Sequence, residues 1–415
     1  MSLIGRGGSM VSSSAILFLV AYWRGPEEAG VYALAVKYTT LVLGFAMLGL
    51  DSLYVRDVAQ KPQQAHNYAV NLSMLRLVLA VLAYGCLSLF VSTVPDYAPH
   101  TTRVVLLYGL SLVPESLFRL FQSALITLHG YDAVARLGVF RAALALPLGI
   151  AALWLGANLE TVVLLQVAVT ALSVLATLVP LRARLAITDS IHDTAGVQRP
   201  SMRQIKRWLR ATSSFAVIDG LYTLEWQIDV ILLSFFVDEE QVGLYGVAQA
   251  VLSILMLVLY SVDAVMFPQI SRVVLRGRAA AKKAYVQLVT VISAASIPAA
   301  IALALGLSFA IPRMLGDEFR PVLAPLYWLI IAWTIHFLNA PGARLIIALG
   351  RQKYIAGLVT VGVAINITVS LLLIPSLGIQ GPAIARVISA AVYGLSASAI
   401  VFWVLNRGWV EPSVP

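Results

Sequence analysis

Long apolar runs recur along this chain, and short polar breaks separate them. Val286–Ile311 and Tyr354–Ile374 are two clear examples. A helix that crosses a bilayer needs about 20 mainly apolar residues, whereas a membrane β-barrel shows alternating segments of about 10 residues. The runs therefore predict an all-α integral membrane protein.

The composition supports this class. Of 415 residues, 60% are hydrophobic and 12% are charged, and the mean hydropathy is +0.87. A soluble domain carries about 25% charged residues. The net charge of +9 lies mostly between the apolar runs, without a basic patch interleaved with aromatic residues, so we expect membrane lipids and no nucleic acid as partners. The single cysteine, Cys86, excludes an internal disulfide.

The runs predict about twelve transmembrane helices. The expected spans are residues 4–23, 31–51, 70–94, 103–128, 134–155, 159–180, 211–236, 242–267, 285–311, 322–348, 354–374 and 382–405. No cleavable signal peptide is evident, because the first apolar stretch runs into Arg24-Gly25-Pro26 without a small-residue cleavage site. We therefore expect the first span to be retained.

Lys and Arg are distributed unevenly over the connections. Odd-numbered connections hold only Arg24, Arg103, Arg313 and Arg320, whereas the even-numbered connections and the tails hold most of the 29 basic residues. Cytoplasmic loops carry the excess of Lys and Arg. The pattern predicts a multi-pass protein with both termini in the cytoplasm.

The longest connection divides the chain into halves. We expect a six-helix lobe over residues 1–180, a cytoplasmic linker with an interfacial helix over 181–210, a second six-helix lobe over 211–405 and a cytoplasmic tail over 406–415. The interfacial helix is predicted from the basic amphipathic run Arg203–Arg210.

The two halves repeat a local pattern. Gly30-Val31-Tyr32-Ala33-Leu34-Ala35 parallels Gly243-Leu244-Tyr245-Gly246-Val247-Ala248, and both follow a pair of glutamates. Each copy opens the second span of its half, and each of those spans ends near an aspartate, Asp51 or Asp263. An even number of spans per half predicts parallel repeats, with a substrate site between the lobes near the midplane. We expect Tyr32 and Tyr245 to be interfacial aromatic anchors.

Catalytic patterns are missing from the sequence. There is no P-loop, no His-Glu-x-x-His and no Cys/His cluster. We therefore expect no enzyme activity, no catalytic residue, no metal site and no cofactor.

The most informative residues are basic side chains at membrane depth, since such residues mark substrate or ion pathways. Lys37, Arg76, Arg119 and Arg141 predict a cationic cavity that suits an anionic head group such as a diphosphate. Arg76 and Arg141 could instead snorkel to the cytoplasmic surface. The i,i+4 spacing of Glu115 and Arg119 predicts an ion pair on one helix face. Arg344 and Arg386 are further candidates for substrate binding in the second half.

Acidic residues gather on the seventh span. Glu225 and Asp229 share a helix face and need a cation, a proton or an arginine nearby. Asp229, with Glu225, Asp219 and the oxygen of Asn366, is therefore a candidate site for a coupling cation or proton. The alternative is a static salt bridge from Asp229 to Arg344 or Arg386.

Several motifs resemble the polysaccharide flippase (O-antigen translocase) family of the multidrug/oligosaccharidyl-lipid/polysaccharide (MOP) exporter superfamily. They are Leu48-Gly49-Leu50-Asp51 with Arg56, Gly25-Pro26-Glu27-Glu28-Ala29-Gly30-Val31-Tyr32, Asp229–Ser234 with Val242–Tyr245, and Asn366 with Pro375–Ala383. The resemblance covers nearly the whole chain. Members of the family usually have more apolar sequence before the Gly-Pro-Glu junction, so we expect the first span to be shortened.

The resemblance implies two six-helix lobes in the cytoplasmic (inner) membrane. It implies a flippase that moves an undecaprenyl-diphosphate-linked oligosaccharide from the cytoplasmic to the outer leaflet by alternating access, coupled to a cation or proton. The implied partners are this lipid-linked substrate and a glycan polymerase complex, and we expect a monomer.

Three alternatives remain at this stage. A cation-coupled multidrug exporter of the same superfamily would suit the acids of the seventh span. A membrane-embedded glycan polymerase or ligase needs a large outer loop, and every predicted outer loop here is short. A non-transporting membrane scaffold for glycan assembly is the third.

Overall fold

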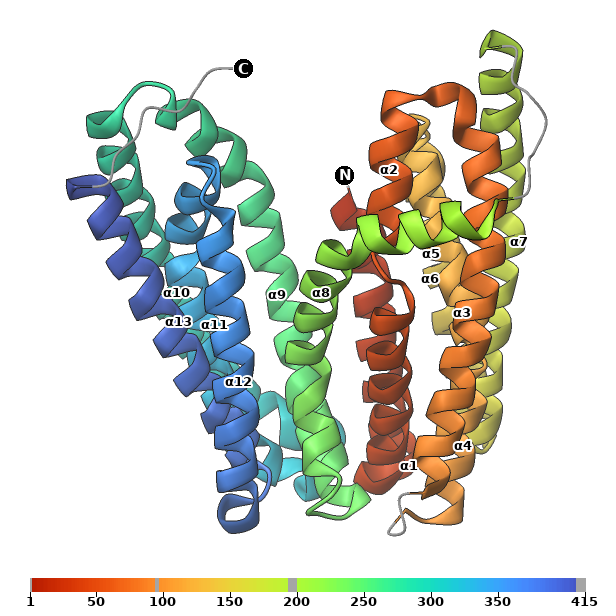
Figure 1. Cartoon of the computed structure of the whole chain (residues 1–415). Coiled ribbons are helices and arrows are strands. Elements are labelled where there is room, and N and C mark those ends of the chain that lie inside the picture. Colours follow the sequence, from red (N-terminus) through yellow and green to blue (C-terminus); the bar gives the residue numbers. More distant parts are fainter. Residues whose placement is uncertain (1, 94–96, 193–199, 408–415) are drawn as a thin grey trace. The chain divides into compact units, whose positions relative to one another are not determined.

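The computed structural model describes residues 2–93, 97–192 and 200–407, and in these ranges the chain is helical with no strand (Figure 1). The prediction of an all-α membrane protein is confirmed. The helices are α1 (Ser2–Ala46), α2 (Leu50–Gln60), the 3-10 helix η1 (Pro62–Gln64), α3 (Ala65–Thr93), α4 (Pro99–Gly109), α5 (Leu112–Thr127), α6 (Tyr131–Trp154), α7 (Leu159–His192), α8 (Met202–Leu233), α9 (Glu239–Val274), α10 (Arg278–Leu315), the 3-10 helix η2 (Asp317–Val322), α11 (Leu323–Ala348), α12 (Gln352–Leu377) and α13 (Gln380–Asn406).

The chain forms two compact units, Met1–Ile231 and Leu232–Pro415. Most of α8 therefore groups with the first unit. Within the predicted linker, α7 continues to His192 and α8 begins at Met202. Residues 193–199 of that linker, and residues 408–415 of the predicted tail, lie outside the described residues. The lobe boundaries drawn from the sequence stay predictions.

By length and composition, ten helical stretches of the described chain could cross a membrane. The difference from about twelve has two sources. The first two predicted spans fall in α1, which counts once although it joins two helices across a kink at Gly25, where φ is 83°. The seventh predicted span lies in α8, which carries the acids Asp219, Glu225 and Asp229 and does not count among the ten. The fourth predicted span is two helices, α4 and α5.

The first unit has an apolar core where α5 ends and α3 and α6 begin, and α2 and α7 pack against the same place. Leu53, Tyr54 and Phe121 are among its buried residues. Trp208, from the first turns of α8, is also part of this core, and its ring lies 5.5 Å from that of Tyr68. The predicted interfacial helix is thus docked by Trp208 and the partly buried Ile205, while its basic side chains, such as Arg207, are exposed.

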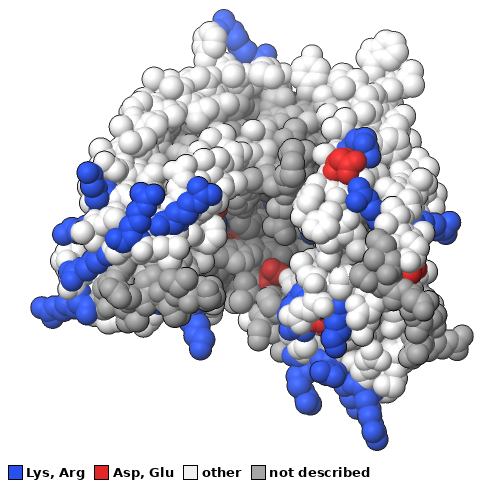
Figure 2. Space-filling view, turned by 90° about the horizontal axis from the view of Figure 1, so that it is seen from above, with Lys and Arg blue, Asp and Glu red and all other residues white. Residues whose placement is uncertain are grey.

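In the second unit, α13 packs along both α11 and α12, and α11 packs along α9. The close approach of α12 and α13 depends on Gly381, since a Cβ at this position would lie 2.8 Å from the backbone nitrogen of Ile374. The end of the helices seen in Figure 2 carries many more Lys and Arg than Asp and Glu side chains.

Tyr32 and Tyr245 are not interfacial anchors. Both side chains are fully buried, and the ring of Tyr32 packs edge-on against Tyr108 at 6.0 Å. The repeat thus places both tyrosines at buried positions, one on α1 and one on α9. The repeated motif is therefore a packing motif.

Candidate functional site

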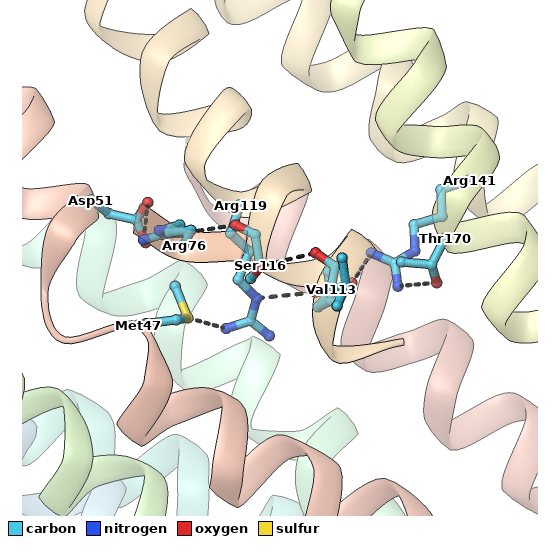
Figure 3. A network of polar contacts seen from close by, with 9 residues as sticks. Met47, Asp51, Arg76, Val113, Ser116, Arg119, Arg141 and Thr170 are labelled. Carbon is cyan, nitrogen blue, oxygen red and sulfur yellow. Dashed lines mark hydrogen bonds and ion pairs between the residues drawn. The ribbon is translucent and has the colours of Figure 1, made fainter. Parts of the chain in front are cut away.

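A network of charged side chains runs through the first unit and joins five helices (Figure 3). It begins where α1 ends. Leu48 and Gly49 have positive φ angles of 46° and 66°, which separate α1 from α2 and place Asp51 in the first turn of α2. A carboxylate is favourable there because the helix N-terminus carries a partial positive charge.

Arg76 of α3 occupies the first part of the network. Its Nη2 lies 2.8 Å from Asp51 Oδ1, and its Nη1 donates to the carbonyl oxygen of Ser116 at 2.6 Å. The side chain is only 1% exposed. Arg76 therefore does not snorkel to the surface; it ties α2 and α3 to α5.

Glu115 of α5 lies in the middle of the network and contacts two guanidinium groups. Arg119 Nε donates to Glu115 Oε1 at 3.0 Å, so the ion pair predicted from the i,i+4 spacing is confirmed. Arg141 of α6 approaches Glu115 Oε2 at 2.8 Å and donates to the hydroxyl of Thr170 on α7 at 3.3 Å. Arg141 is thereby held between three helices.

The network carries an excess of positive charge. Arg76, Arg119 and Arg141 contribute three positive charges against two negative charges from Asp51 and Glu115, a net of +1. The guanidinium group of Arg119 is the most accessible of the three, since its side chain is 42% exposed. Its Nε is fixed by Glu115, and its Nη1 contacts the sulfur of Met47 at 3.7 Å. A positioned, accessible guanidinium suits a phosphate or carboxylate.

The other predicted residues of the first unit lie on α1 and α8. Lys37 is half-buried on α1. On α8, Asp219 is exposed, Glu225 is half-buried and Asp229 is fully buried. Burial of the carboxylates therefore increases along the helix toward Asp229.

The second unit pairs Arg344 with an unexpected partner. Arg344 Nε donates to Asp263 Oδ1 at 2.5 Å, and its Nη2 contacts Oδ2 of the same carboxylate, so the pair is bidentate. The salt bridge from Asp229 to Arg344 or Arg386 that the sequence suggested as an alternative stays a prediction.

Arg386 and Asn366 are buried in the second unit, on α13 and α12, at 3% and 1% exposure. The Oδ1 of Asn366 and the hydroxyl of Ser370, one turn away, have no hydrogen-bond partner among the described residues. A buried oxygen without a donor is energetically unfavourable, so this position suits a bound cation or water.

The sequence reasoning singled out the arginines but not what holds them. Asp51 and Asp263 were noted only as a repeated feature of the second spans, and each accepts an arginine from another helix, Arg76 or Arg344. Thr170 carried no signal at all, because an isolated threonine in an apolar run is common.

Comparison with known proteins places these features in context. Residues 24–324 match the sequence profile of a family described as "Polysaccharide biosynthesis protein". No curated protein matches the chain.

Solved structures share the fold. An inward-facing multidrug resistance transporter of the MATE family in the MOP superfamily superposes with a TM-score of 0.72 at 14% identity, covering 96% of both chains. The lipid II flippase MurJ in an inward closed conformation gives 0.70 at 15% identity, covering 96% of this chain and 87% of MurJ. A MOP-superfamily transporter from Pyrococcus furiosus, titled for the reverse polarity of its binding pocket, gives 0.55 at 13% identity, covering 98% and 94%.

Proposed function

Because the chain belongs to the polysaccharide biosynthesis protein family and has the fold of the MOP-superfamily transporters, we propose that it is a flippase for a lipid-linked oligosaccharide. The substrate would be an undecaprenyl-diphosphate-linked oligosaccharide, moved from the cytoplasmic to the outer leaflet of the inner membrane by alternating access. Both termini would face the cytoplasm, consistent with the basic helix ends seen in Figure 2.

The net positive network of the first unit is the observation that supports this substrate best. A diphosphate needs cationic donors, and guanidinium groups match its oxygens in a forked geometry. Arg119 displays such a group, and Glu115 fixes its orientation. Arg119 and Lys37 are therefore the first candidates for contact with the head group. Arg141 and Arg76 would contribute positive charge to the same network without touching the head group.

The second unit would contribute fewer contacts to the head group than the first unit. Arg344 already holds a carboxylate, and Arg386 is buried on α13. For coupling, Asp229, Glu225 and Asp219 would supply carboxylates, and the unsatisfied oxygen of Asn366 supports a role in binding a cation.

The test is translocation of a fluorescent lipid-linked oligosaccharide by purified protein in proteoliposomes. We expect Lys37→Ala/Arg119→Ala to lower the rate by at least about tenfold, since each charged hydrogen bond contributes about 1.5–3 kcal/mol. The matched control is Lys61→Ala/Arg136→Ala, which removes the same charges from exposed positions of the same unit. Asp229→Asn tests coupling in the same assay.

Equal rates for both double variants, with folded protein, would contradict the head-group assignment. The second candidate, a cation-coupled multidrug exporter, is favoured by the acids of α8. It would be supported if the wild type exported cationic dyes and flipped no lipid-linked oligosaccharide.

A further inference from the structure

A cavity of about 500 Å³ lies between α3 and α4, away from the arginine network. The ends of α3 and α4 that meet here lie at the bottom of Figure 1, opposite to the end that carries α2. Its lining includes Tyr84, Val91, Tyr97, Thr102, Arg103 and Leu106. The cavity lies entirely within the first unit.

The walls of the cavity are held by contacts outside it. The hydroxyl of Tyr97 lies 2.6 Å from the hydroxyl of Tyr38 on α1, which is itself buried. Arg103 Nη1 donates to Glu160 of α7 at 3.2 Å. His100 Nε2 lies 3.3 Å from Glu28, so α1, α4 and α7 are connected at this end. Tyr97 and Arg103, which line the cavity, are therefore held in position before any ligand binds.

The cavity is amphiphilic. Leu106 and Leu107 supply apolar surface, whereas Arg103 and Tyr97 supply polar groups. Arg103 is 65% exposed, and among the described residues it makes one hydrogen bond, through Nη1, which leaves the rest of the guanidinium group accessible to a ligand. Such a combination fits a ligand that has a phosphate next to hydrocarbon.

The position of the cavity at the ends of two membrane helices restricts the ligand further. α3 ends at Thr93 and α4 begins at Pro99, so the cavity lies where two membrane helices end. Tyrosine is enriched at this level of a bilayer, where lipid head groups lie. The connection between these helices is predicted to face outward, because odd-numbered connections carry few basic residues.

We propose that the cavity between α3 and α4 binds the phosphate group of a membrane lipid in the outer leaflet, with Arg103 as the main contact. Two lipids share this chemistry: a phospholipid of the bilayer, and a polyprenyl diphosphate lipid that has reached the outer leaflet. The first source is independent of the proposed function, and the second rests on it.

The experiment is native mass spectrometry of the full-length protein, titrated separately with phosphatidylglycerol, with diacylglycerol of the same chains and with undecaprenyl diphosphate. We expect the wild type to bind phosphatidylglycerol or undecaprenyl diphosphate in the mass spectrometer and to bind no diacylglycerol. Arg103→Gln should lower the affinity of the first bound lipid about tenfold. Because Arg103 is mostly exposed, the variant should keep the thermal unfolding midpoint of the wild type, measured alongside.

The matched control is Arg313→Gln. Arg313 is an exposed arginine of another odd-numbered connection, stacked 3.9 Å from the ring of Phe309, and it does not line this cavity. Equal affinities of the two variants, or equal retention of diacylglycerol and phosphatidylglycerol, would overturn the proposal. Binding of undecaprenyl diphosphate alone identifies the polyprenyl lipid as the ligand, and binding of phosphatidylglycerol identifies the bilayer phospholipid, even if translocation fails.

Discussion

Replacing Glu115 with Gln tests whether the arginine network stabilises the first unit. Glu115 accepts from Arg119 at 3.0 Å and lies 2.8 Å from Arg141, so one carboxylate compensates two guanidinium groups. The amide of Gln has nearly the same size but one acceptor oxygen and no charge. Removing the carboxylate raises the net charge of the network from +1 to +2 and leaves one guanidinium facing an amide N–H.

The expected loss follows from burial. Breaking a buried ion pair by removing one partner costs about 3–5 kcal/mol, and an exposed pair contributes about 0–1 kcal/mol. The Arg141 side of the contact is mostly buried, whereas Arg119 is 42% exposed and partly screened by water. We therefore expect Glu115→Gln to lower the free energy of unfolding by about 3 kcal/mol.

The assay is urea unfolding of the protein in a mild detergent, followed by tryptophan fluorescence. Asp132→Asn is the control, because Asp132 also pairs with an arginine four residues later, Arg136, but both side chains are more than half exposed. Asp132→Asn should cost less than Glu115→Gln, because water screens an exposed ion pair. A loss for Glu115→Gln that is no larger than for Asp132→Asn would refute the reasoning that this network is a structural element.

Two further predictions use the same unfolding measurement. Asp263→Asn removes the bidentate partner of Arg344 and should lower stability by about 2 kcal/mol, and Arg344→Lys should not compensate, because lysine cannot make the forked contact. Gly381→Ala should destabilise by about 1–3 kcal/mol, because its Cβ would lie 2.8 Å from the backbone nitrogen of Ile374, whereas Gly85→Ala, with open space around the new methyl group, should be neutral or stabilising. Equal effects of the two glycine substitutions, or a full rescue by lysine, would contradict these expectations.

Features that depend on one helix were predictable from the sequence. The length of the apolar runs was enough for the membrane class, and the i,i+4 spacing was enough for the pair of Glu115 and Arg119, because helix geometry fixes which residues meet. The sequence also predicted separate spans before and after Gly25. They form one continuous helix, α1, only because the chain stays helical on both sides of the kink. Contacts between helices were not predictable, since Arg141 reaches Glu115 from α6 through packing that no local pattern encodes.

The repeated aspartates show where prediction from the sequence stops. The repeat identified Asp51 and Asp263 as equivalent ends of the second spans, and each forms an ion pair, but the arginines come from α3 in one unit and α11 in the other. A pattern along one helix can identify an acid, whereas its partner is selected by tertiary packing.

This difference changes the order of the substrate-binding candidates. Arg76 and Arg344 each already compensate a carboxylate, so recruiting either one to a diphosphate would leave Asp51 or Asp263 without its partner. Arg119 shares its carboxylate with Arg141, and the network keeps an uncompensated positive charge. An anion that binds at Arg119 therefore balances charge without breaking an existing pair. On this energetic ground Arg119 is the first position to substitute in any search for the head-group site.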